Sequence, residues 1–118
     1  MKFVTLDSNL CCKDIIQNIY NLNDLDILVY NNLKKSKESR VNSIAKKLKK
    51  ERSTIYRSLQ KLTSSKLCIK KTKTIKSGGY YHTYFCNDIN IVRREIEGCI
   101  DNWYLMIKKT LKRLDDEL

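Results

Sequence analysis

Hydrophobic residues in the first part of the chain recur every three or four positions, the spacing of helices that bury one face. The first predicted helix spans about residues 8–20. Its apolar positions are Cys11, Cys12, Ile15, Ile16 and Ile19. A second predicted helix follows Asn23, a residue type that caps helix starts, and the polar stretch 34–39 ends it. Its apolar positions are Leu25, Leu28, Val29 and Leu33.

A shorter helix is predicted over residues 43–49, with Asn42 as its N-cap. Its buried positions are Ile44, Ala45 and Leu48. A turn at residues 50–52 follows, and it contains none of the glycine that is common in helix-turn-helix turns. Ser53 then offers an N-cap for the next helix.

The helix after this turn is predicted over about residues 54–64 and is strongly amphipathic. Ile55, Leu59 and Leu62 form one apolar stripe at positions i, i+4 and i+7. Arg57, Gln60 and Lys61 therefore fall on the opposite, solvent-facing side. Such a helix buries one face and presents a polar face to a partner.

After Leu67 the hydrophobic spacing changes from helical to alternating, which predicts a β-hairpin over about residues 67–87. The adjacent Gly78 and Gly79 mark its turn, because the chain holds only 3 glycines. The returning strand, residues 80–85, is rich in aromatic side chains that favour strands. The predicted register aligns Cys68 with Cys86, Ile69 with Phe85, and Lys70 with Tyr84.

A long helix capped by Asn87 or Asn90 is predicted to run to the C-terminus. Its apolar residues follow a coiled-coil-like spacing with one stutter. They are Ile96, Ile100, Trp103, Ile107, Leu111, Leu114 and Leu118. A small domain cannot bury such a stripe alone, so we expect a second copy of the chain to cover it. We expect the first helix to contribute to the same dimer.

The composition is that of a soluble globular protein, with 42% hydrophobic and 31% charged residues. We expect two parts, a domain over residues 1–88 and a dimerisation helix over residues 89–118. No apolar run approaches the roughly 20 residues of a membrane span, so we expect a cytoplasmic protein without membrane contact. The 5 cysteines are an odd number, which favours free thiols over a disulfide framework. Cys68 and Cys86 offer an alternative, a pair that reports oxidation.

Positive charge is concentrated in the middle of the chain. The formal net charge is +11. Between Lys34 and Lys76 there are 16 Lys or Arg and only 2 acids, a net of +14 for that segment, and the remainder carries −3. A basic segment between nearly neutral flanks is typical of a surface that binds a polyanion.

The order of predicted elements is that of a winged helix-turn-helix, a mainly α fold with a small β-hairpin (α+β) and a long C-terminal dimerisation helix. In this fold the helix at 54–64 would enter the major groove of double-stranded DNA, and the hairpin at 67–87 would lie along the backbone or minor groove. Arg57 suits guanine and Gln60 suits adenine edges. Phosphate contacts are expected from Ser53, Thr54 and Tyr56. Further candidate contacts are Lys46, Lys50, Arg52, Lys61, Lys71, Lys73 and Lys76.

Three stretches carry a resemblance to a known group. They are Ser43–Leu48 (SIAKKL), Arg52–Leu62 (RSTIYRSLQKL) and Gly78–Tyr84 (GGYYHTY). Over about half its length the chain resembles archaeal winged-helix regulators of the TrmB-like and MarR-like group. The resemblance implies a dimeric DNA-binding transcriptional regulator whose trailing helix is the dimer arm. We do not carry over sugar sensing, because no large effector domain follows the hairpin.

Other functions stay open as alternatives. A winged helix can serve as a protein-interaction module, and Tyr80, Tyr81 and Tyr84 could stack on RNA or single-stranded bases. An enzyme is not expected, because the chain has no phosphate-binding glycine loop, paired-histidine zinc motif or nucleophile elbow. We expect no cofactor and no metal, and the residues specify no small-molecule effector.

Overall fold

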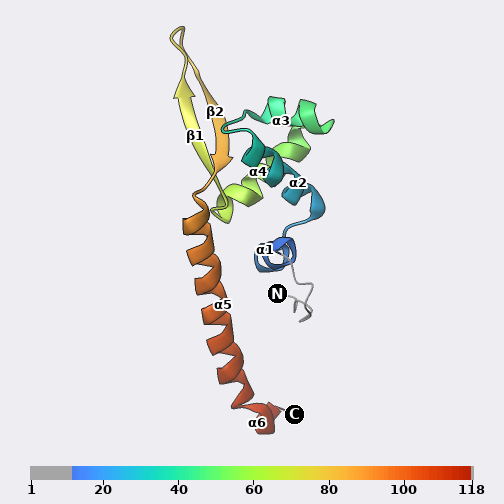
Figure 1. Cartoon of the computed structure of the whole chain (residues 1–118), viewed down its shortest axis with the longest axis vertical. Helices are drawn as coiled ribbons and strands as arrows, with labels where there is room; N and C mark the ends of the chain where they lie inside the picture. The colour runs from blue at the N-terminus through green and yellow to red at the C-terminus, as the bar shows by residue number, and fades with distance from the viewer. Residues whose placement is uncertain (1–11, 118) are drawn as a thin grey trace. The chain divides into compact units, whose positions relative to one another are not determined.

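The computed structural model describes residues 12–117 (Figure 1). The chain divides into two compact units, Met1–Asn87 and Asp88–Leu118. The part of the first predicted helix at residues 8–11, with Cys11, lies outside the described residues, and so does Leu118. The described chain is mainly helical with a two-stranded antiparallel hairpin. This confirms the predicted fold class. The functions expected of the two parts, residues 1–88 and 89–118, stay predictions.

The first unit begins with α1 (Cys12–Tyr20) and α2 (Asp24–Lys35). Asn23 caps α2 as predicted, through a capping box with Asp26. The Asp26 backbone N–H donates to Asn23 Oδ1 at 2.8 Å, and the Asn23 backbone N–H donates to Asp26 Oδ2 at 2.9 Å. The backbone N–H groups of Asn23 and Asp26 at the helix start thus each find an acceptor in the side chain of the other residue.

The buried face of α2 differs from the predicted one at Leu28. That side chain is 47% exposed, whereas Ile27 and Tyr30 are buried. At 100° per residue, Leu28 points almost opposite to Asp26, whose side chain is buried. The helix therefore turns an aspartate inward and a leucine outward, a choice that its hydrophobic pattern does not indicate.

The helix-turn-helix consists of α3 (Val41–Leu48) and α4 (Arg52–Ser64). Each helix begins two residues before its predicted start, so the predicted caps Asn42 and Ser53 are wrong and lie within the first turns. In α3 this brings Val41 into the helix and buries it. The N-caps are Arg40 and Glu51, and neither makes a side-chain capping bond.

Lys49 makes the turn between these helices possible without glycine. Its backbone is left-handed, with φ of 54°, and its N–H bonds to carbonyls of the last turn of α3. Glycine is the usual residue for this conformation, since a Cβ strains it. The missing glycine noted in the sequence is therefore replaced by a strained lysine.

The core of the first unit lies between α2, α3, α4 and the hairpin. The predicted stripe of α4 is confirmed, because Ile55, Leu59 and Leu62 are each 0% exposed. They pack with other fully buried side chains, Val29, Leu33, Ile44 and Leu67. Burying each such side chain contributes roughly 1.5–3 kcal/mol. This core fixes α4 with its polar face outward.

The hairpin consists of β1 (Cys68–Thr74) and β2 (Tyr80–Cys86). The predicted register is confirmed at Cys68 with Cys86, Ile69 with Phe85 and Lys70 with Tyr84. Gly78 and Gly79 adopt φ of 105° and 90° in the turn, conformations that L side chains rarely adopt. The tip of the hairpin projects away from α2, α3 and α4 (Figure 1).

A short extended segment before α3 pairs with the other edge of β2. The Ser39 backbone N–H donates to the Tyr84 carbonyl at 3.0 Å, and the Tyr84 N–H donates to the Ser39 carbonyl at 2.8 Å. The predicted polar loop at 34–39 thus also anchors the hairpin to the helix-turn-helix.

The second unit contains α5 (Ile89–Leu111) and the short α6 (Leu114–Glu117). The N-cap of α5 is Asp88, so the predicted caps Asn87 and Asn90 are wrong. The prediction of one helix to the C-terminus is also wrong, because α5 ends at Leu111. Lys108 with Lys112, and Lys109 with Arg113, would repel each other at i, i+4 in a continuous helix. None of the described helices is long and apolar enough to cross a membrane.

Candidate nucleic-acid interface

The polar face of α4 and the turn before it form an exposed, cationic surface. Arg57 and Gln60 are exposed on α4, and Thr54 and Tyr56 are half-buried at its first turns. The other exposed candidates from this region are Lys46, Lys50, Arg52 and Ser53. The helix-turn-helix thus presents the predicted side chains of α4 to solvent, beside an N-terminus with no side-chain cap. Uncapped N–H groups and the helix dipole favour anions at such an end.

Lys61 differs from its neighbours because its ammonium pairs with the buried carboxylate of Asp26 on α2. The Asp26 side chain is 1% exposed. Burial acts to raise the pKa of Asp26, but hydrogen bonds from Lys61 and Ser58 and the backbone of Asn23 outweigh it, so the pKa lies below its ordinary value. The ammonium of Lys61 is thereby held against α2 and joins α4 to α2.

The lysines of the hairpin also divide into two groups. Lys71 and Lys76 are exposed. Lys73 Nζ donates to Glu38 Oε2 at 2.9 Å, and Thr83 Oγ1 donates to Glu38 Oε1 at 2.6 Å. These hydrogen bonds lower the pKa of Glu38, and the bond to Glu38 raises the pKa of Lys73. Glu38 therefore partly neutralises the positive charge of the hairpin at Lys73. The charge of Lys76, at the tip of the hairpin, stays available to a partner.

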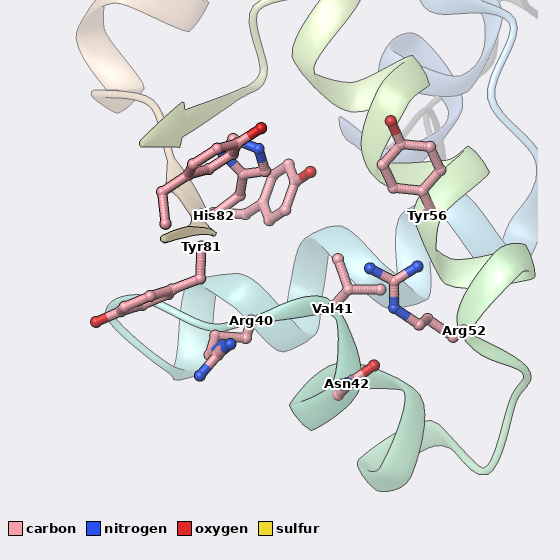
Figure 2. Close-up of a pocket in the computed structure, with 9 residues that line it drawn as sticks. Arg40, Val41, Asn42, Arg52, Tyr56, Tyr81 and His82 are labelled. Carbon is pink, nitrogen blue, oxygen red and sulfur yellow. The ribbon is translucent and has the colours of Figure 1, made fainter. Parts of the chain in front are cut away.

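A pocket of about 240 Å³ lies where the starts of α3 and α4 face β2 (Figure 2). Its lining residues are Arg40, Val41, Asn42, Arg52, Tyr56, Tyr80, Tyr81, His82 and Tyr84. Figure 2 shows the guanidinium of Arg52 extending from α4 toward Val41. Arg40 lies over the ring of Tyr81, 4.2 Å from its centroid. The pocket therefore combines two arginines with a wall of tyrosines.

Tyr84 forms the inner wall of this pocket. It is 2% exposed. Burial raises the pKa of Tyr84, the neighbouring Tyr56 acts in the same direction, and Arg52 acts in the opposite one. Tyr56, Tyr84 and Arg52 all line this pocket. The sequence suggested Tyr84 for base stacking, but its ring is packed inside the domain.

The facing cysteines of the hairpin are free thiols. Cys86 Sγ lies 3.8 Å from the Tyr30 carbonyl oxygen, to which it donates. The hydrogen bond between the two thiols raises the pKa of Cys68, and burial acts in the same direction. The same hydrogen bond lowers the pKa of Cys86 and outweighs burial, which acts to raise it. Oxidation of the pair stays a prediction. Within residues 12–117, no group of three or more His, Cys, Asp or Glu is arranged to hold a metal ion.

Two features of this surface were not found from the sequence. The sequence pattern assigned no role to Arg40, yet it lines the pocket, and Glu38 was counted only as one of the two acids in the basic segment. No helical or strand period marks either residue, because both act across the contact between residues 38–40 and β2. The signal available was their position immediately before α3.

A family model supports the resemblance noted in the sequence. The model for the sugar-specific transcriptional regulator TrmB matches residues 16–90. Two proteins of Methanocaldococcus jannaschii, both named as uncharacterized, are also similar. MJ1503 is 29% identical over 113 residues, which cover 96% of this chain and 81% of that protein. MJ1082 is 30% identical over 99 residues, which cover 84% and 82%.

Solved structures share the fold. A protein described as a possible transcriptional regulator from Methanosarcina mazei Go1 superposes with a TM-score of 0.76 at 24% identity, covering 86% of each chain. The ST1889 protein from Sulfolobus tokodaii gives 0.66 at 20% identity, covering 80% of this chain and 93% of that one. At these identities the likeness shows the architecture alone.

Proposed function

Because the chain belongs to the TrmB family of transcriptional regulators, we propose that it binds specific sites on double-stranded DNA as a homodimer. The family confirms the expectation that the chain is not an enzyme. The observation that carries the proposal is the exposed cationic surface of α4 and the hairpin tip, which a rigid core holds in place.

We assign base recognition to the exposed face of α4, with Arg57 and Gln60 reading base edges. A helix about 10–12 Å wide fits the major groove. Ser53, Thr54 and Tyr56 would contact phosphates from the first turns, and Lys46 and Lys50 would add charge beside them. Lys61 has a smaller part, because its ammonium is paired with Asp26.

We assign contacts with the DNA backbone to the hairpin, which is the wing of the winged helix-turn-helix. Lys71 and Lys76 are exposed, and Lys76 lies in the turn of the hairpin. Lys73 would contribute less, since its ammonium already donates a hydrogen bond to Glu38. Contacts of this kind position the protein on the duplex and carry no sequence information.

Homodimerisation is supported by the apolar surface of the second unit. Ile100 is 44% exposed, Leu111 57% and Leu114 48%. Ile96, Trp103 and Ile107, the other proposed interface residues, are half-buried. Tyr104, Leu105 and Met106 are also exposed, so the apolar face is wider than the predicted stripe. A second copy would bury this face and place two α4 helices on one duplex.

A salt titration on random duplex DNA, with sedimentation of the protein alone, tests the proposal. We expect a dimer whose affinity falls about a thousandfold between 50 and 200 mM salt, as six or more phosphate contacts require. Selection of the preferred site then allows a comparison of Arg57→Ala on selected and random DNA. Lys76→Ala is the matched control, which should weaken both alike.

Three outcomes would contradict parts of this function. A protein without duplex affinity at low salt refutes DNA binding and favours a protein-interaction module. Tighter binding to single-stranded DNA or RNA than to duplex favours the exposed Tyr80 as a stacking platform. A monomer at all concentrations refutes the dimer.

A further inference from the structure

The pocket between α3, α4 and β2 has the chemistry of an anion site. None of its nine lining residues carries a carboxylate, and two of them, Arg40 and Arg52, are arginines. The stacking of Arg40 on Tyr81 fixes the guanidinium plane while leaving its edge able to donate. Planar guanidinium forks match the oxygens of a phosphate.

Two helix starts add to this charge. Val41 and Asn42, the first residues of α3, line the pocket, and so does Arg52, the first residue of α4. Neither helix has a side-chain cap. The positive end of the α3 dipole therefore lies at the hollow, where backbone N–H groups would bind an anion, and the start of α4 contributes Arg52 to it.

Tyr84 supplies an independent observation. No hydrogen bond to its hydroxyl occurs among the described residues, although the side chain is 98% buried, its exposure being 2%. Asn32 Oδ1 is the one fully enclosed side-chain oxygen or nitrogen without a partner in that part of the chain. The Tyr84 hydroxyl must then reach open space, and the space that Tyr84 lines is the pocket. The hydroxyl of this otherwise buried side chain can therefore donate to an acceptor bound in the pocket.

We propose that this pocket binds a phosphoryl group together with part of the molecule that carries it. Arg52 and Arg40 would neutralise the phosphoryl oxygens, and the Tyr84 hydroxyl would donate to one of them. The volume of about 240 Å³ exceeds the roughly 30 Å³ of a water molecule several times over, so there is room for a sugar or a ring against the tyrosines. The phosphoryl group has two chemical sources, a DNA backbone phosphate and a free phosphate ester.

The first experiment needs no DNA. His82 lines the pocket and is the single histidine of the chain, so its ring protons give one readable signal in a proton NMR spectrum. Inorganic phosphate, titrated at constant ionic strength and pH, should shift this signal and saturate at millimolar concentration. Glucose 6-phosphate should saturate at lower concentration, because the pocket has room for more than the anion.

Matched variants separate the site from general charge. Arg52→Gln should abolish the saturation, and Tyr84→Phe should weaken it about tenfold, the loss of a hydrogen bond to a charged group. Arg94→Gln makes the same charge change on α5, outside the pocket, and should leave the titration unchanged. A His82 signal that chloride shifts as strongly as phosphate, or one that Arg52→Gln leaves intact, overturns the proposal.

The second experiment distinguishes the two sources, and it alone rests on the proposed DNA binding. If the pocket holds a backbone phosphate, Tyr84→Phe should weaken duplex binding about tenfold. Inorganic phosphate should then weaken duplex binding more than chloride does at the same ionic strength. If it holds a free ester, Tyr84→Phe should leave duplex affinity unchanged while glucose 6-phosphate alters it through Arg52. Should duplex binding itself be absent, the His82 titration still supports or overturns the phosphoryl site.

Discussion

Replacing Asp26 by asparagine tests how α4 is held in the domain. The carboxylate pairs with Lys61 of α4 and accepts the backbone N–H of Asn23 at 2.9 Å, while its own side chain is 1% exposed. Asp26→Asn keeps the shape of the side chain and removes its charge. We expect a folded but less stable protein, in which α4 is less firmly joined to α2.

The magnitude follows from the contacts that change. Each hydrogen bond to a charged group contributes about 1.5–3 kcal/mol, and a neutral one about 1 kcal/mol. Asparagine can still accept the Asn23 N–H, but it loses the ion pair with Lys61. Lys61 can turn to water, since its side chain is 43% exposed. We expect a loss of about 2 kcal/mol, which lowers Tm by roughly 10 °C in a domain of this size.

Urea and thermal unfolding followed by circular dichroism measure this loss. Asp24→Asn is the matched control, because Asp24 lies in the same turn with its side chain 88% exposed and pairs with Lys13 at 3.5 Å. Its effect should stay below about 0.5 kcal/mol. Equal effects of the two variants would refute the structural role of Asp26.

The pH dependence adds a second readout. The pKa of Asp26 is lower in the folded protein than in the unfolded chain. Its contribution is therefore complete above the unfolded pKa of about 4 and is lost as the pH falls through the lower folded value. Asp26→Asn should flatten the acid side of the stability curve below about pH 5, and Asp24→Asn should not. A wild-type curve that is already flat there would contradict the lowered pKa.

Three other predictions use the remaining features. Arg57→Ala should weaken binding to the selected DNA site by about 1–3 kcal/mol and to random DNA by less, measured by fluorescence anisotropy. Ile100→Glu should convert the dimer to a monomer in sedimentation without lowering the Tm of the first unit, because the side chain is 44% exposed. Lys49→Gly should raise the free energy of unfolding by about 0.5–1 kcal/mol, since glycine relieves the left-handed strain at φ of 54°. Unchanged DNA affinity of Arg57→Ala, an unchanged dimer mass of Ile100→Glu, or an unchanged free energy of unfolding of Lys49→Gly would contradict the corresponding prediction.

The parts of the fold that follow from local periodicity were predictable from the sequence. The stripe of α4 and the hairpin register are examples, because each depends on neighbouring residues and one turn. The start of α2 was predictable too, but the starts of α3 and α4 were not. In α3, burial of Val41 outweighs the local preference for Asn42 as a cap. The Asp26–Lys61 pair and the pocket at Tyr84 join residues far apart in the chain. Such contacts depend on how the elements pack, which no spacing encodes.

The pairing of Ser39 with β2 leaves β1 as the outer strand of the wing. Within the described residues no strand covers its far edge, which offers unpaired backbone groups to another molecule. Lys70, Lys71 and Lys73 lie along this edge, and lysines on an edge strand oppose joining of sheets between molecules. Lys71, to which we assign a contact with the DNA backbone, would then also help to keep the protein from aggregating. Removing it to study binding would therefore reduce solubility, and glutamine is a safer replacement there than valine or isoleucine.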